Sequence, residues 1–522
     1  MSQAAQVQFA AKVEIQMITR RQALHLIGYG MSGLPVIGRS QNAAAGVNPL
    51  KIPELYTGTL DSQARRFSLT LQSGETEFLP GQLTSSYGIN GSYLGPTLRF
   101  SRYEHVAFDV SNTLQEDTSL HWHGFHLPPT EDGGPHQPIA SGQTWSPGFR
   151  VLQYGGTYWY HSHVMHKSGE QVYKGLAGMI IVDDEEHPED LPAEYGVDDI
   201  PVILQDRRFG NDGQFQYRNR YEDIVMGQMG DTILVNGTWQ PHFRPRTQLV
   251  RFRLLNAANA RTFRIALSDE RPFQQIGGDG GLLESPVTLD SLSLAPAERA
   301  EIIVRFSPGE SVNLVSLGRD RQAVSFPGAM PQMLNELNSE PFDLLALHCE
   351  SSLERRAELP GTLTEIYRLP EAAATNTRTF RLNMGNGMRS GADRGPGDGP
   401  RNGTGGGAGG GNYAINGRVM DMNYINERVP LNTTEIWEVS NTSPMMHPFH
   451  IHNGQFQILD RRGKPPAANE MGWKDTVQVH PGELLRLIMR FTDYSDENNP
   501  YMYHCHILEH EDRGMMGQFV LV

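Results

Sequence analysis

"YMYHCHILEHEDRGMM", residues 501–516, places three histidines and one of the chain's two cysteines within the seven positions from His504 to His510. Imidazole and thiolate are common protein ligands of copper, zinc and iron. The letters YHCH at 503–506 are nearly repeated by YHSH at 160–163, and each copy leads to G-x-x-G and an apolar run. The C-terminal stretch therefore repeats part of the first third of the chain.

A second repeat is offset by 329 residues, whereas YHSH and YHCH are 343 residues apart. VSNT occurs at 110–113 and again at 439–442, and eleven residues after each valine comes an H-x-H pair, His121/His123 and His450/His452. The middle third has a similar strand and asparagine in RLLNAANA, at Asn256, but no H-x-H pair follows it. We therefore expect the first and last thirds to be versions of one domain, and the middle third to be a copy without ligands.

The residue pattern along the chain is typical of β-strands. Runs such as LVRFRLLNAANARTFRIAL (249–267) and ELLRLIMRFT (483–492) are β-rich or alternate with period two, and helical periodicity is sparse. A length of 522 residues suggests about three domains. The pattern suits an all-β fold of β-sandwiches or barrels, and we place three consecutive domains at 46–185, 195–350 and 379–522, with a linker at 351–378 and a glycine-rich insertion at 385–412.

Composition narrows the function. The net charge of −15 argues against nucleic acid or an anionic membrane as the main partner, because both call for a basic face. The two cysteines, Cys349 and Cys505, allow at most one disulfide, and none if Cys505 is a ligand. We expect Cys349 to be a free buried thiol. The insertion lacks the Gly-Lys-Ser/Thr of a phosphate-binding loop, and no run after the N-terminal stretch is long enough to span a membrane.

The N-terminal stretch ITRRQALHLIGYGMSGLPVIGRSQNAAAG (18–46) has the layout of an export signal, with Arg20 and Arg21 before a mildly apolar run and three small residues. It resembles a twin-arginine signal, which implies export by the twin-arginine machinery to the periplasm and a mature chain that begins near residue 46. Met17 would then be a natural start. The alternative is a disordered tail with two chance arginines.

Four H-x-H pairs stand out among the 19 histidines, where chance gives roughly 0.7 pairs. On a strand, residues i and i+2 point to one face, so each pair can offer two imidazoles to a common centre. Cys505 lies between the fourth pair, so its sulfur points the opposite way, toward a separate centre. With His447, His510 and the thioether of Met515, it forms the ligand set of a blue-copper site. The pairs are His121/His123, His161/His163, His450/His452 and His504/His506.

HWHGFH (121–126), YHSH, HPFHIH (447–452) and HCHILEHEDRGMM (504–516) resemble, in order and spacing, the four copper-binding motifs of multicopper oxidases. Stretches such as DDIPVILQDRRF and GKPPAANEMGWKDTV look most like the bacterial copper-efflux oxidases, with spore-coat laccases and bilirubin oxidases as further relatives. The resemblance implies an all-β fold of three consecutive cupredoxin-like Greek-key β-sandwich domains. It also implies about four copper ions, and oxidation of a donor coupled to reduction of O2 to water.

The resemblance also implies the ligand sets. A type 2 copper would be held by His121 and His450. One type 3 copper would be held by His123, His161 and His506, and the other by His163, His452 and His504. A type 1 copper would be held by His447, Cys505, His510 and Met515. Cys505 would pass electrons to His504 or His506. Asp132 and Glu511 would relay protons, and the alternative for each is an exposed acid or a partner that holds a histidine's other nitrogen.

We expect the electron donor to be Cu(I) or a phenolic or aromatic compound. Thioethers suit Cu(I), and six methionines lie near the predicted type 1 site. Methionine also fills core gaps, Ser443 stands where copper-efflux oxidases have an aspartate, and the insertion is poor in Met. Cuprous oxidation in copper tolerance is the first hypothesis, and a laccase-like phenol or bilirubin oxidase is the alternative. The methionines are Met445, Met446, Met384, Met388, Met420 and Met422.

Three other classes are weaker alternatives. A copper-free periplasmic scaffold of this fold predicts lost ligands, and none is lost. A copper nitrite reductase has two domains per chain and no type 3 pairs. A zinc hydrolase needs about three ligands and an open position. We expect a monomer, and we expect the nine histidines outside the predicted ligand sets to be surface or packing residues.

Overall fold

The computed structural model describes residues 46–185, 188–218, 220–318, 341–384 and 413–522. All of them belong to one unit, residues 45–522. The predicted export signal, Met388 and the predicted insertion lie outside the described residues. We call residues 46–185 the first segment, 188–350 the middle segment and 351–522 the last segment.

Two sheets form the first segment. One has the strand order β2 (Leu55–Tyr56), β6 (Thr97–Ser101), β12 (Ala177–Asp183), β11 (Gly156–His161) and β8 (His121–His123). The other has the order β10 (Gly148–Arg150), β7 (His105–Asn112), β4 (Arg65–Leu79) and β3 (Thr59–Leu60), with β5 (Gln82–Ile89) on β4 and β9 (Thr144–Trp145) on β7. A cluster of buried side chains that includes Phe67, Phe108 and Trp122 forms the core of this segment.

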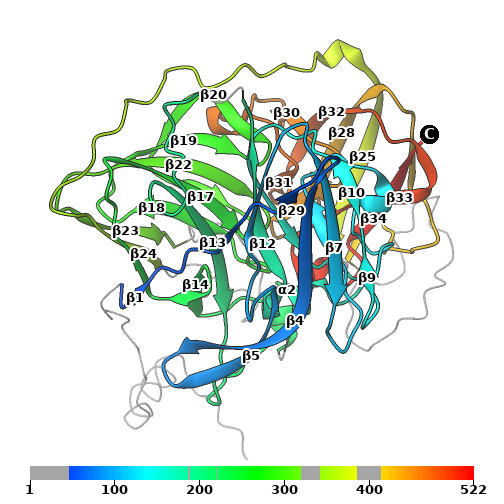
Figure 1. Cartoon of the computed structure of the whole chain (residues 1–522). Coiled ribbons are helices and arrows are strands. Elements are labelled where there is room, and N and C mark those ends of the chain that lie inside the picture. Colours follow the sequence, from blue (N-terminus) through cyan, green and yellow to red (C-terminus); the bar gives the residue numbers. More distant parts are fainter. Residues whose placement is uncertain (1–45, 186–187, 219, 319–340, 385–412) are drawn as a thin grey trace, which may run out of the picture. The chain divides into compact units, whose positions relative to one another are not determined.

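The larger sheet of the middle segment has the order β15 (Thr238–Trp239), β14 (Thr232–Val235), β13 (Asp199–Arg207), β17 (Leu249–Asn256), β22 (Arg299–Arg305), β19 (Phe273–Gly278) and β20 (Gly281–Leu289) (Figure 1). Its second sheet has the order β1 (Asn48–Pro49), β16 (Pro241–Phe243), β24 (Phe342–His348), β23 (Ser311–Ser316), β18 (Phe263–Leu267) and β21 (Leu292–Leu294). β1 pairs with β16, so Asn48–Pro49 joins a sheet of the middle segment although it falls within the predicted first domain.

The last segment repeats the two-sheet plan. One sheet has the order β26 (Tyr413–Ile415), β25 (Ala374–Met384), β28 (Thr433–Asn441), β32 (Leu484–Phe491) and β30 (Phe456–Arg461). The other has the order β27 (Glu427–Val429), β34 (Met516–Leu521), β33 (Asp496–Cys505), β29 (His447–Ile451) and β31 (Thr476–Val479). β25 begins at Ala374, inside the predicted linker.

Helices are short in the described part. The α-helices are α2 (Ser168–Lys174), α3 (Tyr221–Val225) and α5 (Leu508–Glu511), and the 3-10 helices are η1 (Pro129–Glu131), η2 (Glu371–Ala373) and η3 (Ala468–Glu470). Gly175 ends α2 with a φ of +126°, a conformation that favours glycine. None of the helices that the structure describes is long and apolar enough to cross a bilayer. The all-β prediction of three sandwiches is confirmed.

The internal repeat is visible in hydrogen bonds. Asn112, Asn256 and Asn441 end β7, β17 and β28, and all three are buried. In each, Oδ1 accepts the N–H two residues ahead, and Nδ2 donates to a carbonyl four or five residues ahead and to a distant one, at 2.7–3.0 Å. The three segments are therefore copies of one plan, as the repeated strand and asparagine predict.

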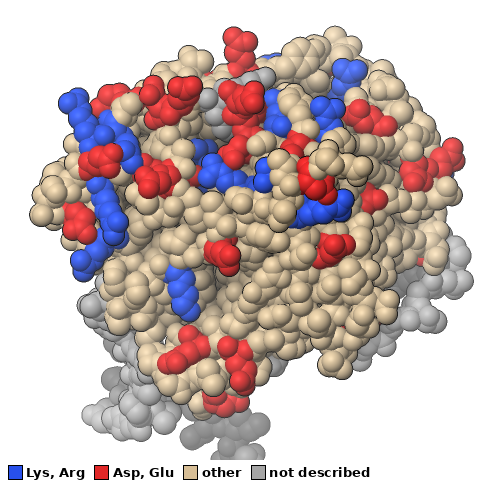
Figure 2. All heavy atoms as spheres, in the orientation of Figure 1, with Lys and Arg blue, Asp and Glu red and all other residues tan. Residues whose placement is uncertain are grey.

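On the face in Figure 2, charges of both signs are interspersed. Lys and Arg side chains lie among Asp and Glu side chains, mainly in the upper part of the view. This face therefore presents a mixed field and not a basic one.

Candidate metal centres

Strand register sets the histidine pairs in equivalent places. β8 pairs with β11 so that His121 is opposite His161, and β29 pairs with β33 so that His450 is opposite His504. Only the first pair, on β8, lies wholly on a strand. In the other three pairs the second histidine lies just past the strand end, which differs from the expectation of four strand-borne pairs.

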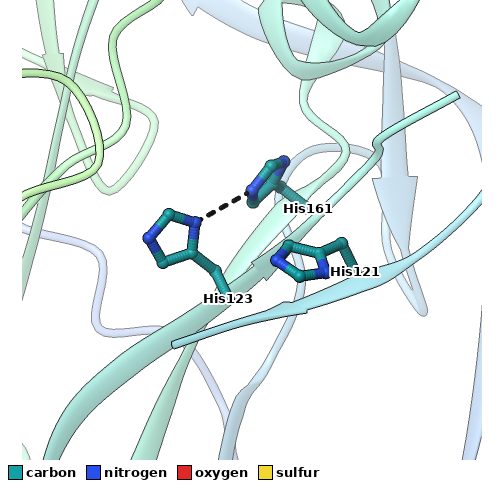
Figure 3. Close-up of side chains that lie close together, drawn as sticks. All are labelled: His121, His123 and His161. Atoms are coloured by element: carbon teal, nitrogen blue, oxygen red, sulfur yellow. Dashed lines mark hydrogen bonds between the residues drawn. The ribbon is translucent and has the colours of Figure 1, made fainter. Parts of the chain in front are cut away.

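All eight predicted imidazoles nevertheless meet in one buried cluster. Each of the eight histidines is at most 1% exposed. Rings from the first and last segments stack on each other, His121 on His452 with centroids 3.9 Å apart and His123 on His450 at 3.7 Å. Figure 3 shows His121, His123 and His161 gathered around one point, with the contact between His161 Nε2 and His123 Nδ1 at 3.4 Å dashed.

Hydrogen bonds leave His121 and His450 with one free nitrogen each. The Nδ1–H of His121 donates to the backbone carbonyl of Asp132, and that of His450 donates to the carbonyl of Asp475, both at 2.8 Å. Their Nε2 atoms are buried without a hydrogen-bond partner among the described residues. Because a carbonyl can only accept, the proton lies on Nδ1, and each Nε2 presents a lone pair to the cluster.

Three further Nε2 atoms converge on one another. His504 Nε2 lies 3.2 Å from the Nε2 of His163 and 3.2 Å from that of His452. Their Nδ1 atoms face carboxylate oxygens, of Asp132 at 2.7 Å for His452 and of Glu511 at 3.3 Å for His163 and His504. With the protons on Nδ1, three lone pairs point at each other. A shared cation resolves this arrangement, so these residues fit a metal ion.

The remaining trio is His123, His161 and His506. His123 Nε2 lies 3.1 Å from Asp475 Oδ1, which leaves its Nδ1 facing His161. Both ring nitrogens of His506 are buried without a partner among the described residues. His506 is in ring contact with both others, with centroids 5.1 Å from His123 and 5.2 Å from His161.

Burial sets the charge of these groups. It lowers the pKa of all eight imidazoles, in the case of His506 to about 3, so they are neutral, the form that binds metals. Burial also raises the pKa of the Asp132 carboxyl well above its usual range, and burial together with the nearby Asp512 raises that of Glu511. Both carboxyl groups can therefore hold a proton.

The second centre surrounds Cys505. Its Sγ lies 3.2 Å from His447 Nδ1 and 3.7 Å from His510 Nδ1, and the Ile507 N–H donates to it at 3.5 Å. Cys505 and Met515 are fully buried in the core of the last segment, while the neighbouring His504 lies in the histidine cluster. Burial raises the pKa of the thiol, so a bound metal is what would deprotonate it.

The outer nitrogens of this centre are covered by the chain. His447 Nε2 lies 2.7 Å from Ser443 Oγ, and the Nε2–H of His510 donates to the carbonyl of Val225, which ends α3, at 3.0 Å. Tyr413 stacks on His510 with centroids 4.6 Å apart. Both imidazoles are 0% exposed, so within the described part no ring edge is open to a donor.

Three of the predicted methionines are buried in the core or pack against it. Met445 belongs to the hydrophobic cluster that holds Cys505 and Met515, and Met384 packs against the same cluster. Met446 is 4% exposed. Met420 and Met422 are half-buried.

Sequence reasoning missed three contributors and misjudged one residue. Asp475 holds His123 and His450, Arg299 holds Asp475, and Val225 covers His510 with a backbone carbonyl. Only Asp475 left a signal, in the WKDTV stretch that carries the family resemblance. The prediction of a buried Cys349 thiol was wrong: the residue is half-buried, because it lies just past the end of β24, and burial raises its pKa to about 11.

Comparisons with known proteins identify the family. Models described as "Multicopper oxidase" match residues 70–187 and 396–522. The multicopper oxidase mco of Staphylococcus haemolyticus is 32% identical over 91% of this chain and 93% of its own length. The cell division protein FtsP of Photorhabdus laumondii is 34% identical over 97% of this chain and 98% of its own.

A similar solved structure supports the same family. The laccase-like multicopper oxidase CueO of the lignin-degrading Ochrobactrum sp., described as having oxidase activity towards lignin model compounds, superposes with a TM-score of 0.78 at 34% identity, over 91% of this chain and 100% of that one. The chain belongs to the multicopper oxidase family, with its cupredoxin-type sandwiches. Membership implies copper binding and oxidoreductase activity, and the two matched stretches contain both candidate centres.

Proposed function

We propose that this chain is an oxidase that couples one-electron oxidation of Cu(I) to four-electron reduction of O2 to water. The convergence of unpartnered, buried imidazole nitrogens on one cluster, beside a second set at Cys505, carries the proposal. Bound copper, in the ligand sets that the resemblance implies, would supply the electron storage and O2 binding that side chains lack.

Cys505 connects the two centres. Its thiol lies beside His447 and His510, and its chain neighbours His504 and His506 lie in the histidine cluster. Only a few covalent bonds therefore separate the sulfur from imidazoles of the other centre, which suits electron transfer along the chain from the donor side to the O2 side.

Two carboxyl groups would handle protons. Glu511 lies 3.3 Å from the Nδ1 atoms of both His163 and His504, and Asp132 lies 2.7 Å from the Nδ1 of His452. Both also orient those rings. Because burial raises their pKa, each can carry a proton at its oxygens and release it toward the cluster, where reduction of O2 consumes four.

The cover over the Cys505 centre favours a small donor. A phenol that bound an imidazole edge would have to displace Ser443 Oγ from His447 or the Val225 carbonyl from His510. Cu(I) needs only soft or oxygen ligands beside the centre. Met445 and Ser443, two and four residues before His447 and both buried, offer a thioether and a hydroxyl. We therefore place cuprous oxidation, in copper tolerance, first.

Oxygen uptake at equal concentrations of Cu(I), a phenol and bilirubin tests this choice. We expect the cuprous rate to be the highest. Ser443→Ala removes a group from the cuprous approach but opens His447 Nε2, so it should lower the cuprous rate relative to the phenol rate. A wild-type cuprous rate far below the phenol rate would make the chain a laccase-like oxidase, the description that the Ochrobactrum protein carries.

The second candidate is a scaffold in cell division. Identity of 34% over 97% of the chain with a cell division protein FtsP favours it. The presence of every predicted ligand side chain in the described part, and the convergence of the eight imidazoles, weigh against it. If the purified protein still contains no copper after incubation with copper, that result would support the scaffold function.

We also propose periplasmic export. The twin-arginine pattern in residues 18–46 supports it. N-terminal sequencing of the mature protein should begin near residue 46, and a full-length chain in the cytoplasm would contradict the proposal.

A further inference from the structure

Arg299 links the middle segment to the histidine cluster. It opens β22, is 1% exposed, and donates to Asp475 through Nη1 to Oδ1 at 2.8 Å and through Nη2 to Oδ2 at 2.5 Å. Asp475 in turn lies against His123 and His450. The segment that contributes no histidine to the cluster therefore reaches it through this bidentate pair.

The guanidinium cannot turn. Its other three N–H groups donate to backbone carbonyls, of Ala297 at 2.9 Å, Asp279 at 2.8 Å and Thr157 at 3.1 Å. All five donors are thus satisfied within a buried site. Because Arg299 is fixed by three carbonyls from the first and middle segments, the carboxylate plane of Asp475 is fixed as well.

A fixed carboxylate decides which nitrogen His123 offers. Asp475 Oδ1 lies 3.1 Å from the Nε2 of His123, so an ionised carboxylate keeps the proton there and leaves the lone pair on Nδ1, which faces His161. His121 and His450 have the opposite arrangement, with Nδ1 donating and Nε2 free. Without Arg299, Asp475 would be an unpaired buried acid whose carboxylate could turn, and the choice at His123 would be lost.

We infer that Arg299 is a positioning residue for the histidine cluster: through Asp475 it fixes the nitrogen that His123 presents to copper. The inference rests on the proposed copper function. Loss of a partner that orients a ligand typically weakens metal binding by about 10–100-fold. Arg299→Met should therefore weaken copper binding at the cluster by that factor and leave the Cys505 centre, which Arg299 does not touch, unchanged.

Arg253 supplies a matched control. It is buried on β17, the neighbouring strand of the same sheet, and donates to the same Thr157, at 3.1 Å. Its carboxylate partners are Asp199 and Glu301, at 2.7 and 2.8 Å. Arg253→Met removes an equally buried charge at the same interface without touching Asp475.

The test is copper retention against a graded chelator, read as copper per chain and as blue absorbance in the same samples. We expect Arg299→Met to lose its non-blue copper at about 10–100-fold less chelator than wild type and to keep its blue absorbance. Arg253→Met should match wild type in both, even if its melting temperature falls. Arg299→Lys, which keeps the charge and part of the contact, should fall between, and it replaces Arg299→Met if that variant does not fold.

Equal retention by wild type and Arg299→Met would overturn the inference, as would the same loss in Arg253→Met. Parallel loss of blue and non-blue copper in Arg299→Met would also overturn it, because it would mark a general destabilisation. A wild-type protein that binds no copper would instead remove the proposed function, and the inference with it.

Discussion

Glu511→Gln should slow reoxidation by O2 without affecting electron entry. The carboxyl lies 3.3 Å from two imidazole Nδ1 atoms, and glutamine keeps its shape but has no proton to give. A positioned acid typically contributes about 10²- to 10⁴-fold to a rate, or about 2.7–5.5 kcal/mol of barrier. The amide can accept from one Nδ1–H but turns its NH2 toward the other, which adds about 1–3 kcal/mol of lost interaction at the cluster.

The assay separates the two halves of the reaction. After copper content is matched to wild type, a donor bleaches the blue absorbance anaerobically, and O2 is then mixed in by stopped flow. We expect an unchanged bleaching rate and a return of the absorbance slowed by about 10²-fold or more.

Glu509→Gln is the control. Glu509 is also fully buried on α5, but its oxygens accept from Asn259, Tyr217 and the Gln228 N–H, and no cluster histidine is among these partners. Reoxidation of copper-replete Glu511→Gln at the wild-type rate, or equal slowing in both variants, would refute the assigned proton role.

Two further predictions concern stability. Burial alone would raise the pKa of Glu301, but Arg251 and Arg253 outweigh it and lower the pKa from 4.5 to about 2, which corresponds to about 3 kcal/mol at neutral pH. Because the folded-state pKa is lowered, the ionised carboxylate stabilises the fold above pH 4.5, and this stabilisation is lost as the pH falls toward 2. The difference in melting temperature between wild type and Glu301→Gln, both copper-free, should therefore narrow over that range. A constant difference would contradict this assignment. Asn441→Ala and Asn256→Ala each leave two carbonyls and one N–H unpaired, at about 1–3 kcal/mol per group, and should lower the melting temperature alike. Only Asn441→Ala, which releases the loop before the Cys505 centre, should weaken the blue absorbance; equal weakening in both would count against the proposed centre.

Local pattern explains why so much of the fold was predictable. VSNT lies at the end of a strand in both copies, and the H-x-H pair that follows it at the same spacing of eleven residues reaches an equivalent place in each sandwich. The H-x-H pairs converge even where the second histidine lies one or two residues past the strand. The ligand candidates were therefore readable from spacing.

The residues that support the cluster were not readable in this way. Arg299 and Asp475 are 176 positions apart, and His123 and Asp475 are 352 apart, so only the packing of three segments brings them together. The cover on His510 is a backbone carbonyl, which no side-chain pattern announces. The methionines near Cys505 had two interpretations in sequence, and the structure shows Met445 and Met384 packed in or against the core.

Copper per chain, measured by elemental analysis after reconstitution of the purified protein, tests the central claim most directly. We predict about four copper ions, one of them giving the blue absorbance of a copper-thiolate centre. A protein that retains no copper, or only two ions, would contradict this claim.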